Sequence, residues 1–175
     1  CWTLLQLTSI GGVFGAATTC VVVSPFVQQK LPFVLMGEQQ FDVIIVGAGF
    51  GGIGAAIQLS SLGYENILIV GSGHLTHNLM DYLRPAGERP APDSQAFRDW
   101  VHARLTGNPG EAAEALFDWQ QHAPGAAFSH PTPEHFLPLF VALGAAGKTF
   151  RTEWLGGGWI EKALAADNYL FARAP

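Results

Sequence analysis

Charged residues are scarce in this sequence, and basic residues form no cluster. Only 13% of the 175 residues are charged, and the formal net charge at pH 7 is -5. Because no group of Lys and Arg is interleaved with aromatic residues, the sequence excludes a nucleic acid as the partner. A hydrophobic content of 49% also excludes a disordered chain, and it fits a globular or partly membrane-associated protein with one core.

Cysteine is also scarce, and no histidine precedes His74. Cys1 and Cys20 have neither the CxxC spacing of a zinc or redox site nor the spread pattern of a disulfide framework. They therefore do not define the redox compartment. The chain begins with Cys rather than Met, from which we expect a fragment or a processed product.

Residues 1–40 form an apolar leader, with no charged residue before Lys30. The stretch 2–27 is long enough to cross a bilayer as a helix. Polar residues dilute it, however, and the run Val21-Val22-Val23, which ends at a proline, fits a buried strand equally well. Both alternatives stay open. The helix would make a membrane the partner of residues 2–27, whereas the strand predicts a cytoplasmic protein.

Residues 41–70 predict a strand, a glycine turn, a helix and a second strand. Gly47, Gly49 and Gly52 form G-x-G-x-x-G at the start of the helix, where a backbone can approach a pyrophosphate. The segment resembles the N-terminal FAD-binding segment of flavin-dependent monooxygenases of the Baeyer-Villiger type, which implies FAD as a cofactor. No acidic residue follows Val70, so the alternative is a glycine turn that only tightens the packing of strand and helix.

The alternation of strands and helices predicts an α/β fold with a central, largely parallel sheet and flanking helices. Residues 41–175 form this domain, divided into a Rossmann-like β-α-β unit (41–70) and a second part (71–175). The second part is expected to contain a helix 94–105 with Ser94 as its N-cap, a helix 111–121, a helix that starts at Pro133 after the N-cap Thr132 and ends at Gly144 or Gly147, and a strand 168–171. Pro138 should bend the third helix.

Two short loops hold four of the six histidines. The first histidine loop, residues 71–78, follows an apolar strand and contains His74 and His77. The second histidine loop, residues 129–135, contains His130, Glu134 and His135, and two prolines stiffen it. Imidazole and carboxylate groups are the usual donors of a non-haem metal centre, so the two loops predict a metal site.

Four stretches of the second part match one family. They are Gly71-Ser72-Gly73 with Thr76-His77-Asn78-Leu79, the string from His130 to Leu139, the string from Ala142 to Ala146, and Asp167-Asn168-Tyr169-Leu170-Phe171. In these stretches the sequence resembles the C-terminal part of the class III extradiol ring-cleaving dioxygenases, specifically the 4,5-DOPA dioxygenase group. The resemblance implies an enzyme that opens the ring of a small catechol with O2, with Fe(II) in catalysis and often Zn(II) as isolated. Such a metal lowers the phenol pKa and brings both reactants together.

The resemblance also implies roles for the histidines. His135 matches the family's metal-ligand histidine, and His77 matches a histidine that lies at the metal and can act as an acid or a base toward the catechol. His130 and Glu134 are expected to orient His135 or its loop through hydrogen bonds, and His130 is a further catalytic candidate. His74 stands where the family varies, so it receives no role.

The family supplies its further metal ligands from its N-terminal half, where this sequence has no histidine. His77 and His135 provide two ligands where a stable non-haem iron centre needs about three. The sequence is therefore expected to be composite, joined near Val70, and its metal site is expected to be incomplete or inactive. The alternatives are a flavin- or nicotinamide-dependent oxidoreductase fragment and a membrane-tethered remnant without enzymatic activity. His102 and His122 are expected to be solvated or partly packed.

Overall fold

The computed structural model describes residues 19–23, 41–47, 49–83 and 90–173. The leader predicted from the sequence falls within these ranges only at residues 19–23. The rest of the predicted membrane-spanning stretch, 2–18 and 24–27, lies outside the described residues. Within the described ranges, no helix is both long enough and apolar enough to cross a membrane.

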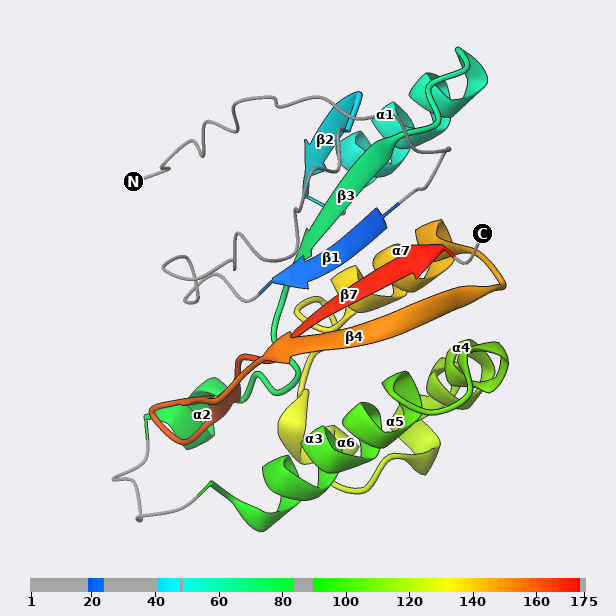
Figure 1. Ribbon diagram of the computed structural model, residues 1–175. Coiled ribbons are helices and arrows are strands. Elements are labelled where there is room, and N and C mark those ends of the chain that lie inside the picture. Colours follow the sequence, from blue (N-terminus) through cyan, green and yellow to red (C-terminus); the bar gives the residue numbers. More distant parts are fainter. Residues whose placement is uncertain (1–18, 24–40, 48, 84–89, 174–175) are drawn as a thin grey trace.

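A five-stranded sheet forms the centre of the fold (Figure 1), with the strand order β2-β3-β1-β7-β4. Strands β1 and β2 are parallel to β3, whereas β7 is antiparallel to both β1 and β4. The sheet is therefore mixed. The predicted parallel arrangement holds for β2, β3 and β1, and the pairs that β7 forms with β1 and β4 are antiparallel. An antiparallel pair needs only a short connection, and the β4–β7 connection contains just a small antiparallel hairpin, β5 and β6. The strands are β1 (Thr19–Val23), β2 (Val43–Val46), β3 (Ile67–Ser72), β4 (Phe150–Gly156), β5 (Trp159–Ile160), β6 (Leu164–Ala165) and β7 (Asn168–Arg173).

Strand β1 lies between the two halves of the sheet. Val21 is in register with Val70 of β3 on one side and with Leu170 of β7 on the other. The valine run predicted as a strand is thus confirmed as a strand, and it joins the parallel half to the antiparallel half. Residues 19–23, which the sequence placed in the leader, are part of the central sheet.

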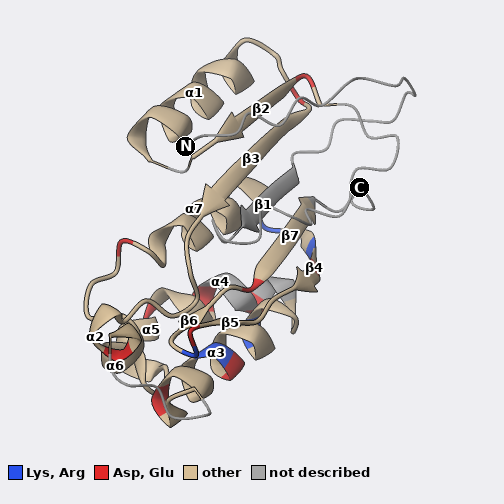
Figure 2. Cartoon of the chain, turned by 90° about the vertical axis from the view of Figure 1, so that its left-hand side faces the viewer, with Lys and Arg blue, Asp and Glu red and all other residues tan. Residues whose placement is uncertain are grey.

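The predicted strand, glycine turn, helix and strand of residues 41–70 are confirmed as β2, α1 (Phe50–Ser61) and β3. A Cβ at Gly52 would overlap the carbonyl of Gly47 and lie 3.4 Å from the side chain of Ile45. Gly52 therefore allows the helix to approach the strand closely, as the packing alternative predicted. Binding of FAD by Gly47, Gly49 and Gly52 stays a prediction. Figure 2 shows that α1, β2 and β3 carry no charged residue.

Six helices besides α1 are described, and α3 matches its prediction well. It begins at Pro92, two residues before the expected start, so Ser94 is buried inside the helix and Ala91 is the N-cap. Phe97 and Val101 on its inner face are fully buried. The helices are α2 (Leu79–Tyr82), α3 (Pro92–Leu105), α4 (Pro109–Phe117), α5 (Trp119–His122), α6 (Ala126–Ser129) and α7 (Leu137–Ala146).

Two other helix predictions were wrong in their limits. The expected helix 111–121 is divided into α4 and α5, because the backbone of Asp118 is not helical. The helix expected to start at Pro133 starts at Leu137 instead. A helix through Pro138 would lack its hydrogen bond to residue 134 and its ring would clash with that carbonyl, whereas proline is well tolerated in a first turn. Pro138 therefore opens α7 rather than bending it, and the expected end is confirmed with Gly147 as the C-cap.

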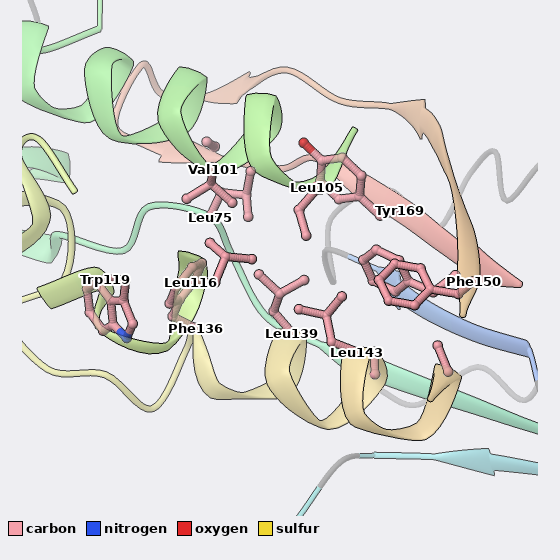
Figure 3. Close-up of a cluster of buried hydrophobic side chains, with 14 of the residues drawn as sticks. Leu75, Val101, Leu105, Leu116, Trp119, Phe136, Leu139, Leu143, Phe150 and Tyr169 are labelled. Atoms are coloured by element: carbon pink, nitrogen blue, oxygen red, sulfur yellow. The ribbon is translucent and has the colours of Figure 1, made fainter. Parts of the chain in front are cut away.

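The main hydrophobic core lies between α3 and α7 (Figure 3). Val101 and Leu105 of α3 face Leu139 and Leu143 of α7, and Tyr169 of β7 closes the cluster beside them. Helix α7 also packs against β1, β3 and β7. Since the second histidine loop leads directly into α7, this packing fixes its position relative to the sheet.

Candidate metal centre

The first histidine loop continues directly from β3, and three hydrogen bonds tie it to two distant segments, the second histidine loop and β6. Each tie is a backbone N–H that donates to a carbonyl: His74 to His135 (3.0 Å), Leu75 to Ala165 (3.0 Å) and His77 to Ser129 (2.8 Å). Two of these bonds join the two histidine loops to each other. The loops therefore have a fixed register, although 61 residues separate His74 from His135 in the sequence.

Side chains on both sides of His77 reinforce these ties. The hydroxyl of Thr76 donates to the carbonyl of Ala163 (2.9 Å) and accepts from the N–H of Ala165 (2.7 Å), and the side chain is fully buried. The amide of Asn78 donates to a carbonyl of α6 at 2.7 Å. Its side-chain oxygen also accepts from two backbone N–H groups at the start of α2 and caps that helix. His77 is thus held between two fixed residues.

Glycine is required where the two loops meet. A Cβ at Gly73 would overlap the carbonyl of His135, and a Cβ at Gly71 would lie 2.9 Å from the carbonyl of Pro138. Neither obstacle is a flexible side chain, because both are backbone atoms. The absence of a side chain therefore allows the two loops to touch at Gly73, and it allows the first loop to touch the start of α7 at Gly71.

His74, His77 and His135 form a cluster at this contact. One ring nitrogen from each lies within 4.8 Å of the other two. The rings of His77 and His135 are stacked, with centroids 3.5 Å apart and planes at 22°, and the ring of His74 lies 5.6 Å from His77 and 6.4 Å from His135. Nitrogens bound to one zinc ion at about 2.0–2.1 Å are closer together than 4.8 Å, so small side-chain movements would bring all three around a divalent ion.

The electrostatics favour the neutral imidazole at His74 and at His77. Burial, followed by the charges of His77 and His135, lowers the pKa of His74 from 6.5 to about 4. Burial and then the charge of His135 lower the pKa of His77 as well, against an opposing effect of Glu134. A neutral imidazole presents a lone pair, which is the form that binds a metal. The donor set therefore fits a divalent metal ion.

His130 and Glu134 lie differently from each other. His130 is 4% exposed, and its ring packs among Phe97, Trp119 and Phe136. Its Nε2–H donates to the carbonyl of Leu75 at 2.8 Å. Leu75 lies between the two histidines of the first loop in the sequence. Burial lowers the pKa of His130 to about 4, against the effect of this hydrogen bond. His130 therefore supports the first histidine loop from inside the core.

Glu134 is exposed, and its carboxylate accepts a hydrogen bond from the hydroxyl of Thr132 at 2.6 Å. This bond is the first cause of the lowered pKa of Glu134. The carboxylate thus stabilises the turn of the second histidine loop.

A second network lies beside the cluster. The carboxylate of Asp167 accepts from two nitrogens of Arg98 (2.6 and 2.8 Å) and from the indole of Trp154 (3.0 Å). Asp167 also lines a small cavity together with His74 and His135. The hydrogen bonds to Asp167 raise the pKa of Arg98. This network holds the segment before β7 against α3.

The structure brings together the two histidines predicted at the metal, His77 and His135. It adds His74, which sequence reasoning had left without a role, although its place three residues before His77 was a usable signal. Gly47, Gly49 and Gly52 lie at the turn between β2 and α1, and none of them contributes to the cluster.

The two remaining histidines lie outside the cluster. His122 is exposed, and His102 is half-buried with its Nδ1 2.8 Å from the hydroxyl of Tyr169.

Comparison with known families identifies the fold that carries this cluster. Residues 50–172 match the family described as the catalytic LigB subunit of aromatic ring-opening dioxygenase. The chain belongs to the LigB family. The match includes both histidine loops, and it begins at α1, so the LigB part also includes β3. The join near Val70 that the sequence suggested lies inside the matched residues.

Individual LigB relatives agree with this assignment. The chain is 34% identical over 113 residues to the 4,5-DOPA dioxygenase extradiol of Beta vulgaris, covering 65% of this chain and 41% of that protein. It is 36% identical over 88 residues to the protein of the same description in Escherichia coli strain K12, covering 50% and 32%. A crystal structure of an uncharacterized E. coli K12 protein superposes with a TM-score of 0.54 and 28% identity, covering 67% of this chain and 48% of that one. The chain thus spans less than half the length of each of these relatives.

Proposed function

We propose that this chain forms the metal-binding part of an extradiol ring-opening dioxygenase that acts on a small, DOPA-like catechol with O2. The observation that carries the proposal is the cluster of imidazoles where the two histidine loops of a LigB fold meet. The relatives described as 4,5-DOPA dioxygenases support the choice of substrate class.

In this proposal, His135 and His77 hold a divalent metal ion through one ring nitrogen each. The metal, Fe(II) in catalysis or Zn(II) as a stable substitute, supplies the charge that lowers the pKa of the catechol hydroxyls and gathers both reactants. The second ring nitrogen of His77 holds a proton, and it can donate a hydrogen bond to the substrate because His77 is half-buried. His130 does not reach the substrate; it keeps the first histidine loop in place through the carbonyl of Leu75.

The test combines metal analysis with a ring-opening assay. We expect the purified 175-residue chain to retain Fe(II) or Zn(II), and the Fe(II) form to convert DOPA to a yellow ring-opened product. His135→Ala should lose both properties, whereas His122→Ala, at an exposed position outside the cluster, should keep both. Equal metal content in the chain and in His135→Ala would refute the site. A chain that retains metal at this site but yields no product would refute the activity alone.

A further inference from the structure

We infer that His74 is a metal ligand, so that His74, His77 and His135 form a three-imidazole site. The inference rests on the proposed function, because it concerns the same metal. It adds a ligand at a position that the family motif does not specify.

The position of His74 is the first argument. Its side chain is 8% exposed, and one of its nitrogens lies within 4.8 Å of a nitrogen of each of the other two histidines. An imidazole buried in this way faces the protein rather than the solvent. Catalytic metal sites commonly use three protein ligands and keep one position open, which is the number that His74 completes.

The backbone around His74 is the second argument. The N–H of His74 donates to the carbonyl of His135. At the neighbouring Gly73, the two loops are so close that a side chain would not fit between them. The backbones of His74 and His135 are therefore held together at hydrogen-bonding distance. Rigid backbone support of this kind is what a metal ligand needs in order to stay within bonding distance.

The third argument is that the two carboxylates near the cluster, those of Asp167 and Glu134, already accept hydrogen bonds from other residues. Asp167 lines the same small cavity, but its oxygens already accept hydrogen bonds from Arg98 and Trp154. Glu134 is exposed and accepts from Thr132. Among the residues that the structure describes, His74 is therefore the donor best placed to be the third ligand.

A three-imidazole site has a chemical consequence. Neutral ligands leave the 2+ charge of the ion uncompensated, whereas a site with a carboxylate ligand would neutralise part of it. The remaining charge favours an anionic fourth ligand, such as an ionised ring hydroxyl. Imidazole donors also suit zinc, iron and cobalt, so Co(II) is a valid spectroscopic probe of the site.

The decisive experiment places a different donor at position 74. In His74→Cys, a thiolate replaces the imidazole as a possible ligand. We expect Co(II) added to the full chain to bind in this variant and to give a thiolate-to-cobalt charge-transfer band that the unchanged chain lacks. Since Cys1 and Cys20 are also present, His122→Cys serves as the matched control and should show no such band. Cobalt-loaded His74→Cys without the band would overturn the inference.

Zn(II) affinity, measured by competition with a chromophoric chelator, separates this inference from the proposed function. Loss of an outer-sphere partner costs about 10–100-fold in affinity, so His74→Ala and His135→Ala should each weaken binding by more than about 100-fold. If His135→Ala weakens binding and His74→Ala does not, His74 is no ligand but the proposed metal site stands. If neither weakens it, or the unchanged chain binds no metal, both fail. Circular dichroism of each variant shows that a loss of binding is not a loss of fold.

Discussion

Acidification should destabilise the metal-free protein through His130. This imidazole is 4% exposed among Phe97, Trp119 and Phe136, and burial lowers its pKa from 6.5 to about 4. In the unfolded chain, the pKa of His130 returns to its ordinary value of 6.5. Between pH 6.5 and pH 4, the unfolded state therefore binds more protons than the folded state. The free energy of unfolding must therefore fall as the pH falls through this range.

The two pKa values determine the size of the effect. Linkage gives a loss from His130 of about 2 kcal/mol at pH 5 and about 3 kcal/mol at pH 4, relative to neutral pH. In His130→Phe, an aromatic ring still fills the site but nothing titrates there. The carbonyl of Leu75 loses its donor, so this variant should also be less stable by about 1–3 kcal/mol at neutral pH.

Urea unfolding at pH 7, 6 and 5, with a metal chelator present, measures both quantities. His74 also has a lowered pKa and contributes a loss of the same sign, so the His130 effect is the difference between the unchanged chain and His130→Phe. His122→Phe, at an exposed histidine, should follow the unchanged chain. If His130→Phe loses as much stability between pH 7 and pH 5 as the unchanged chain does, the reasoning about His130 is refuted.

Three further substitutions test other parts of the structure. Asp167→Asn removes the charge that pairs with Arg98, whose side chain is only 21% exposed, and should cost about 2–4 kcal/mol in urea unfolding; a cost below about 0.5 kcal/mol would show that solvent screens the pair. Gly73→Ala should weaken Zn(II) binding at least about tenfold, because its Cβ would separate the two histidine loops. Gly54→Ala, whose Cβ meets open space, is the control and should leave the Zn(II) affinity unchanged. If Gly73→Ala binds Zn(II) as tightly as Gly54→Ala, the contact between the loops is contradicted. Phe97→Ala should cost about 3–5 kcal/mol by opening a cavity in the core, and calorimetry showing an unchanged melting temperature would contradict that packing.

Local patterns predicted much of the fold. The apolar runs and the glycine turn of residues 41–70 were sufficient for β2, α1 and β3, because each element is determined by short-range spacing. The apolar face of α3 was likewise visible. The antiparallel half of the sheet was harder to foresee, since β4 contains Arg151 and Glu153 and is defined by its pairing with β7. The start of α7 depended on Pro138, whose effect on the preceding turn outweighed the capping signal at Thr132.

The candidate site was predicted in part. The two loops and the pair His77 and His135 were found from the sequence, because the loops contain strings typical of one family. His74 received no role from the sequence, because a contact with a loop 61 residues away brings it to His135, and only its spacing from His77 pointed to it. The position of His130 inside an aromatic core was equally invisible, since its neighbours Phe97 and Trp119 come from two other helices.

Strand β1 precedes the residues that match the LigB family, yet it lies between the two strands that lead to and from the cluster. β3 runs into the first histidine loop, and β7 follows Asp167, but β3 and β7 pair with β1 rather than with each other. The family-matched residues therefore do not close their own sheet. A different N-terminal region would therefore complete this sheet only if it supplied one short strand of the same direction. For engineering, the same strand is a place where a separately supplied peptide of five or so residues could restore, and thereby control, a truncated protein.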